Sequence, residues 1–154
     1  MITEVQAADV VTYLVAIGAT TAKDAQGQAW ADWVNDEVPE AQPAELLEAT
    51  RLAIRIWKRQ GKAYQVDATH FSDALKQLRA ERIEKAEQAS PVLPEGLEDE
   101  PIVERRWINA AKENIRAGMP RGQAEALAWQ SIGRTPPPEL ETRSRSVCPQ
   151  LRRA

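Results

Sequence analysis

The side chains best suited to chemistry are few in this 154-residue chain, which holds one histidine and one cysteine. His70 lies near the expected start of a helix, where we interpret it as a surface or packing residue and not as a proton shuttle. Cys148 has only arginines nearby to activate it, and a single cysteine excludes an internal disulfide. Two acidic pairs stand in expected loops without a catalytic partner: Asp36-Glu37 and Asp99-Glu100. We therefore predict no catalytic residue and expect that the protein is not an enzyme.

Motifs that bind metals, cofactors or phosphates are also missing from the sequence. The chain has no Gly-rich phosphate loop, no Gly-x-Ser-x-Gly and no His/Cys cluster with metal-ligand spacing. It has no run of 18 apolar residues, and its first residues lack the basic region of a secretory signal. We expect no cofactor, no metal, no small-molecule substrate, no membrane contact, and a cytoplasmic location.

Charge is distributed unevenly along the chain, although the net charge is only -3. Residues 1–48 carry nine acids and one base, whereas residues 49–62 carry five bases and no acid. Residues 90–104 carry five acids, and residues 134–154 carry five arginines against two glutamates. The small net charge arises because acidic and basic segments offset each other, so it does not exclude a polyanionic partner.

Apolar residues recur at helical spacing through the first ninety residues, and no alternating pattern typical of strands occurs. Thr3 with Gln6 fits a capping box for a first helix, and Thr21 is expected to begin a second. Pro43 suits the first turn of a third helix, which runs to about Gln60. Asp67 is expected to cap a fourth. Together these segments predict a compact four-helix bundle over residues 1–89.

The second half of the chain has a different composition. Residues 90–101 hold three prolines and four acids, which predicts a Pro-rich acidic linker. Residues 102–133 are predicted to form a helical hairpin, with Gly118 at its turn, that binds a partner or packs on the first half. Residues 134–154 are expected to be a disordered basic tail. The predicted fold class is all-α.

The third expected helix has apolar residues on two arcs and cations between them. The cations are Arg51, Arg55, Lys58 and Arg59. Cations along one helix face can follow the phosphates of a nucleic acid or an acidic protein surface. The alternative is a solvated face that opposes the acidic N-terminal helices. Arg79 and Arg82 would extend this surface if the third and fourth helices ran side by side.

The five tryptophans are expected to have two different roles. Trp30, Trp33 and Trp57 lie on core stripes and are predicted to pack in the core. Trp107 and Trp129 lie in the weakly anchored second half, where large aromatic side chains serve as interface anchors. We predict that these two contact a partner.

Three segments resemble one known family in their order and pattern. They are "AWADWVNDEV", "ELLEATRLAIRIW" and "VDATHFSDALKQLRAER". Residues 5–89 look like the small helical replisome organisers and helicase loaders of phages that infect Gram-positive bacteria. The family's usual proline before the last helix is replaced here by Val66-Asp67-Ala68. The resemblance implies a helical N-terminal domain, a flexible C-terminal region that contacts the replicative helicase, and no catalytic residues.

We therefore expect a non-enzymatic phage DNA-replication accessory protein in the cytoplasm of the host cell. Its partners would be the replicative helicase, an initiator protein, or both, and DNA is a further candidate. One alternative is a helical DNA-binding transcriptional regulator, and another is a self-associating structural phage protein.

Overall fold

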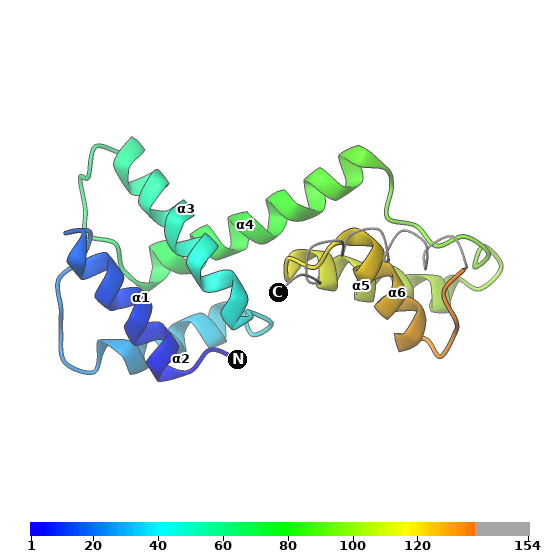
Figure 1. Ribbon diagram of the computed structural model, residues 1–154, viewed down its shortest axis with the longest axis horizontal. Coiled ribbons are helices and arrows are strands. Elements are labelled where there is room, and N and C mark those ends of the chain that lie inside the picture. Colours follow the sequence, from blue (N-terminus) through cyan, green and yellow to red (C-terminus); the bar gives the residue numbers. More distant parts are fainter. Residues whose placement is uncertain (138–154) are drawn as a thin grey trace, which may run out of the picture. The chain divides into compact units, whose positions relative to one another are not determined.

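The computed structural model describes residues 1–137, and all regular elements in that range are helical (Figure 1). They are α1 (Glu4–Ala16), α2 (Gln26–Glu37), the 3-10 helix η1 (Pro43–Glu45), α3 (Leu46–Arg59), α4 (Ala68–Ala89), α5 (Pro101–Arg116) and α6 (Arg121–Ser131). The predicted all-α class is confirmed. No helix of the described part is both long and apolar enough to cross a membrane. The predicted tail lies outside the described residues from position 138 onward.

The chain divides into two compact units, and the division falls inside α4. The first unit covers Met1–Ala80 and the second begins at Glu81. The sequence had placed this boundary in residues 90–101, after the fourth helix. Each unit has its own cluster of buried apolar side chains.

The first unit begins with α1, which the sequence predicted closely. The Thr3 side chain accepts a hydrogen bond from the Gln6 backbone N–H at 3.3 Å, and Gln6 Oε1 accepts one from the Thr3 N–H at 2.9 Å. This reciprocal pair satisfies two N–H groups that the first turn leaves without helical partners. Leu14 is fully buried, and its neighbours in the core include Trp30 and Phe71, whose rings lie 6.0 Å apart.

Helix α2 differs from the prediction at its start and on one face. It begins at Gln26 rather than Thr21, after Ala25 in the left-handed region with φ 55°, and no side chain caps it. Trp33 is 44% exposed, so its predicted core role is wrong.

Gly27 explains how α2 packs on α1: a Cβ here would lie 2.9 Å from Ala8 Cβ. The glycine therefore permits a close approach of the two helices.

Helices α3 and α4 supply most of the remaining core of the first unit. Both predicted apolar arcs of α3 are largely buried, although Leu47 is exposed. The Asp67 carboxylate accepts the His70 backbone N–H at 3.0 Å, which confirms the predicted cap of α4. The apolar stripe of α4 is buried in the core: Phe71, Ala74, Leu75 and Leu78.

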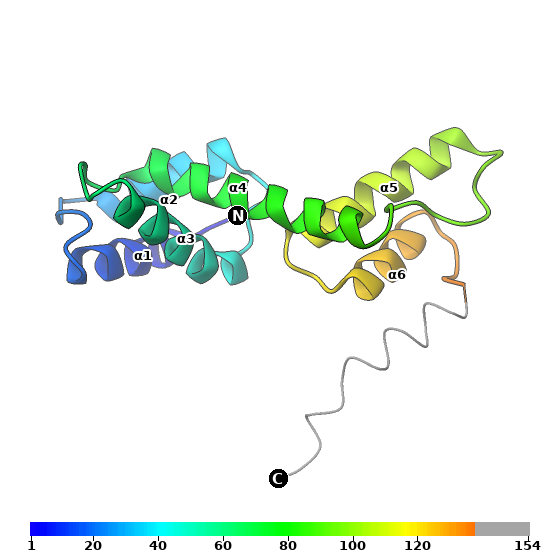
Figure 2. The ribbon, with the colours of Figure 1, turned by 90° about the horizontal axis from the view of Figure 1, so that it is seen from above.

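The second unit packs α5 against α6, side by side in Figures 1 and 2. Its core also contains the segment that the sequence predicted as a linker. Val92 and Leu97 are 2% and 1% exposed and belong to the same cluster as Trp107. Ile83 and Ala86, near the end of α4, pack against this cluster. Residues 90–100 are thus a folded part of the second unit and not an extended spacer.

Arg121 fastens residues 90–100 to α6. Its guanidinium donates to the carbonyl oxygens of Ala86, Ser90 and Pro91 at 2.9, 2.7 and 2.8 Å, and its Nε donates to Glu125 Oε1 at 2.6 Å. The three carbonyls belong to the last turn of α4 and the residues after it, where a helix leaves carbonyl groups unsatisfied; the Ala86 carbonyl also accepts the Ser90 N–H at 3.3 Å. The planar fork of arginine matches such a set of acceptors, which a lysine could not bind together.

Candidate functional site

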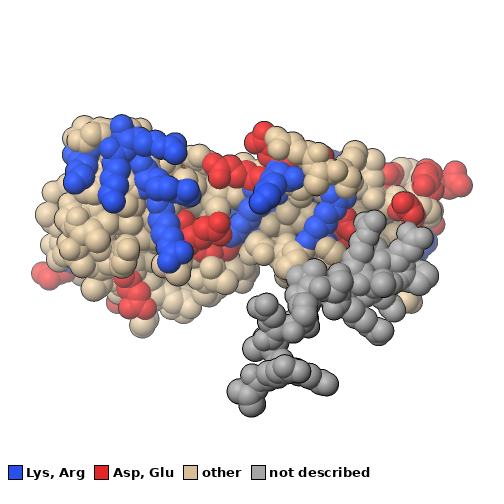
Figure 3. Space-filling view, turned by 45° about the horizontal axis from the view of Figure 1, so that its top comes forward, with Lys and Arg blue, Asp and Glu red and all other residues tan. Residues whose placement is uncertain are grey.

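The cationic strip predicted on α3 is exposed, as Figure 3 shows by the Lys and Arg side chains gathered on one face of the first unit. Its members Arg51, Arg55, Lys58 and Arg59 are all exposed, and the residues between them point into the core. Within residues 1–137, none of these four cations takes part in an ion pair. This exposure fits both a contact with a partner and the alternative of a solvated face that opposes the acidic N-terminal helices.

The end of α3 adds a fifth cation that the predicted site omitted. Gly61 and Lys62 both adopt positive φ, at 69° and 58°, and the Lys62 N–H donates to the Trp57 carbonyl at 3.1 Å. This turn places Lys62 Nζ 5.4 Å from the centre of the Trp57 ring, a cation–π distance. Trp57 is itself fixed, because its indole N–H donates to the Tyr64 carbonyl at 2.7 Å. The sequence signal was present, since Lys62 belongs to the acid-free segment 49–62.

Arg79 does not extend the strip, and its predicted contact role is wrong. It is 5% exposed, and its Nη1 donates to Glu45 Oε2 at 2.8 Å in a pair whose carboxylate side chain is fully buried. The same oxygen accepts the Gln42 N–H at 2.8 Å. A desolvated arginine bound to a carboxylate is a structural pair and not a surface for a polyanion.

Arg82 belongs to the second unit, whereas the four cations of the strip belong to the first. Its Nη1 donates to the Arg116 carbonyl at 2.6 Å, near the C-terminal end of α5. A Cβ on Gly118 would lie 3.1 Å from its guanidinium carbon, so the glycine leaves room for this contact. Arg82 therefore stabilises the turn between α5 and α6, and its predicted contact with a partner stays a prediction.

Trp107 and Trp129, which we predicted to contact a partner from a weakly anchored half, are buried in the core of the second unit. They are 1% and 5% exposed, and their ring centres lie 5.7 Å apart at 60°. A tilted pair at this distance is a favourable aromatic arrangement. The sequence could not show this, because the residues that cover them come from the segment interpreted as a linker.

His70 forms a small polar cluster at the start of α4. Its ring stacks on Tyr64 with centres 4.2 Å apart, and its Nδ1 lies 2.6 Å from Asp67 Oδ1. Partial burial raises the pKa of Asp67, but the hydrogen bonds from the His70 backbone and ring outweigh it and hold that pKa below its usual value of 3.8. These contacts place His70 in the cap of α4, where its ring packs on Tyr64.

Metal-binding groups do not gather in the described part of the chain. Within it, no three or more His, Cys, Asp or Glu side chains form a group that could hold a metal ion. Cys148 lies outside the described residues. Searches for similarity brought no family either: no protein-family model, curated protein or solved structure matches the chain.

Proposed function

We propose that the protein is a non-enzymatic adaptor of DNA replication, of the helicase-loader or replisome-organiser type. In this proposal the strip on α3 contacts the phosphates of DNA or an acidic face of an initiator, and the second unit binds a protein such as the replicative helicase. The observation that carries the proposal is the row of exposed cations on α3, none of which has an ion-pair partner within residues 1–137.

The dimensions of the strip suit a nucleic-acid backbone. Arg51 and Arg59 are eight residues apart, which is about 12 Å along a helix axis. Duplex DNA carries one phosphate per strand for about every 3.4 Å of its axis, so the strip spans about three or four phosphates of one strand. Lys58 and Arg59 also lie in the last turn of α3, where the helix dipole favours positive charge.

The DNA contact is tested by fluorescence anisotropy of the full chain with a labelled duplex across a salt series. With four phosphate contacts, the logarithm of the binding constant should fall against the logarithm of salt concentration with a slope of about -3.6. Arg51→Gln, Arg55→Gln and Lys58→Gln should each weaken binding and reduce the steepness by about 0.9.

A matched control is Arg106→Gln, which removes one exposed cation from α5 in the second unit. We expect it to leave the affinity and the salt slope unchanged. Absence of duplex binding at low salt, or an equal effect of Arg106→Gln, would remove DNA as the ligand of the strip. The partner of the second unit is tested separately, by measuring binding of the full chain to the purified replicative helicase and initiator of the host.

A further inference from the structure

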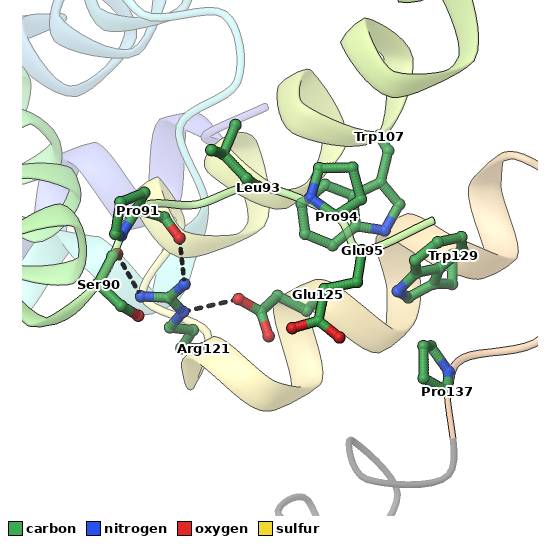
Figure 4. Close-up of a pocket in the computed structure, with 10 residues that line it drawn as sticks. All are labelled: Ser90, Pro91, Leu93, Pro94, Glu95, Trp107, Arg121, Glu125, Trp129 and Pro137. Atoms are coloured by element: carbon green, nitrogen blue, oxygen red, sulfur yellow. Dashed lines mark hydrogen bonds and ion pairs between the residues drawn. The ribbon is translucent and has the colours of Figure 1, made fainter. Parts of the chain in front are cut away.

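A pocket in the second unit has the two buried tryptophans in its wall (Figure 4). Its volume is about 250 Å³, room for one or two amino-acid side chains. The apolar part of the lining comes from Trp107 on α5, Trp129 on α6, the segment 91–94 after α4, and Pro137. Three prolines thus border a site that also presents two indole rings.

Both indole N–H groups at this pocket lack an acceptor among residues 1–137. Trp107 Nε1 and Trp129 Nε1 are buried and make no hydrogen bond with this part of the chain, whereas Trp57 Nε1 donates to a carbonyl at 2.7 Å. In Figure 4 each nitrogen lies on the side of its ring nearer Glu95. A buried donor without a partner is unfavourable, so a ligand that brings acceptors to these atoms gains affinity.

The rim of the pocket carries an unpaired negative charge. Glu125 is 7% exposed and its Oε1 is bound by Arg121, so these two charges compensate each other. Glu95 is exposed and makes no hydrogen bond or ion pair within residues 1–137. The pocket therefore offers aromatic walls, two N–H donors and one free carboxylate.

We propose that this pocket binds a proline-containing peptide segment with a cationic side chain, supplied by the partner protein of the second unit. A proline ring packs on an indole face, and a proline-rich segment leaves its carbonyl oxygens free as acceptors for indole N–H groups. An arginine or lysine beside the proline would pair with Glu95 and lie over a tryptophan ring. The role of this contact in an adaptor rests on the proposed function, but the binding itself does not.

The test uses the indole N–H signals of the full chain in a proton–nitrogen NMR spectrum. The probe is the peptide acetyl-Pro-Pro-Arg-Pro-Pro-amide, compared with versions in which Arg becomes Glu or all four prolines become alanine. Addition of the probe should move the signals of Trp107 and Trp129 downfield and leave that of Trp57 in place. The two control peptides should bind more weakly.

Glu95→Gln is the matched variant, because its side chain is exposed and its loss does not disturb the core. It should lower the affinity for the probe peptide about threefold and reduce the salt dependence of peptide binding. The affinity of the α3 strip for duplex DNA should stay unchanged. If the natural chain binds the peptide but does not bind duplex DNA, this result counts against the proposed function and not against the pocket.

Two results would overturn the proposal. One is that the Trp107 and Trp129 signals stay in place up to about 1 mM probe, the weak end of specific binding. The other is that substitution of Arg143 and Arg145 by serine moves these signals without any peptide, which would assign the pocket to the chain's own C-terminal segment.

Discussion

Arg79 and Glu45, which are 34 residues apart in the sequence, form a buried ion pair with 2.8 Å between Nη1 and Oε2. Arg79→Met should lower the free energy of unfolding by about 3–5 kcal/mol, because Glu45 is then left as a buried charge without its partner. Chemical denaturation followed by circular dichroism measures this loss.

The double variant Arg79→Met with Glu45→Leu provides the control for this pair. We expect it to recover a large part of the lost stability, since two apolar side chains can replace a buried ion pair at little cost. If the double variant is as unstable as the sum of the two single variants, the pair does not act as a coupled unit.

Gly27 should resist substitution although it lies inside a helix. Alanine is favoured over glycine in a helix by about 1 kcal/mol, but its Cβ would lie 2.9 Å from that of Ala8. We expect Gly27→Ala to destabilise the protein by about 1 kcal/mol net. Gln28→Ala, at an exposed site of the same helix, should be close to neutral in the same thermal melt.

Asp67 should make the free energy of unfolding depend on pH in the acidic range. Its pKa is lower in the folded protein than the usual 3.8, so its stabilising effect is complete above the unfolded-state pKa and is lost as pH falls through the folded-state pKa. Asp67→Ala should cost about 1 kcal/mol near neutral pH, through loss of the cap.

Asp67→Asn separates the cap from the charge, because asparagine also caps helices. The difference in melting temperature between the natural protein and this variant should be largest near pH 6 and shrink below about pH 4. A difference that stays constant down to about pH 2.5 would contradict the role of the carboxylate charge.

Arg121→Lys should loosen the segment after α4. Lysine keeps the charge but cannot reach Ala86, Ser90, Pro91 and Glu125 together, so we expect a loss of about 2 kcal/mol or more. Amide hydrogen exchange should rise at Ser90 and Gly96, whose N–H groups donate hydrogen bonds within this segment. Arg116→Lys, at an exposed pair with Glu113, should leave these amides protected.

Local signals in the sequence predicted the helices well. The capping box at Thr3, the cap at Asp67 and the stripe from Phe71 to Leu78 depend on residues within one or two turns of each other. Exposed cations on α3 followed from the same periodicity, because its apolar positions occupy the remaining face.

Long-range packing explains what the sequence did not predict. Val92 and Leu97 stand among prolines and acids, and their burial depends on α5, α6 and the end of α4. Arg79 lies on a helix beside other charged residues, and only the distant Glu45 reveals that it is buried. Trp107 and Trp129 looked unanchored for the same reason, since their cover comes from residues 90–97.

The packing of Ile83 and Ala86 against the second core has a practical consequence for dissecting the molecule. A cut at Ser90, where the composition changes, would separate Arg121 from the Ala86 carbonyl and remove two apolar side chains from the second core. A fragment of the second half would therefore need to begin near Glu81, within α4, to keep its own interior closed to water.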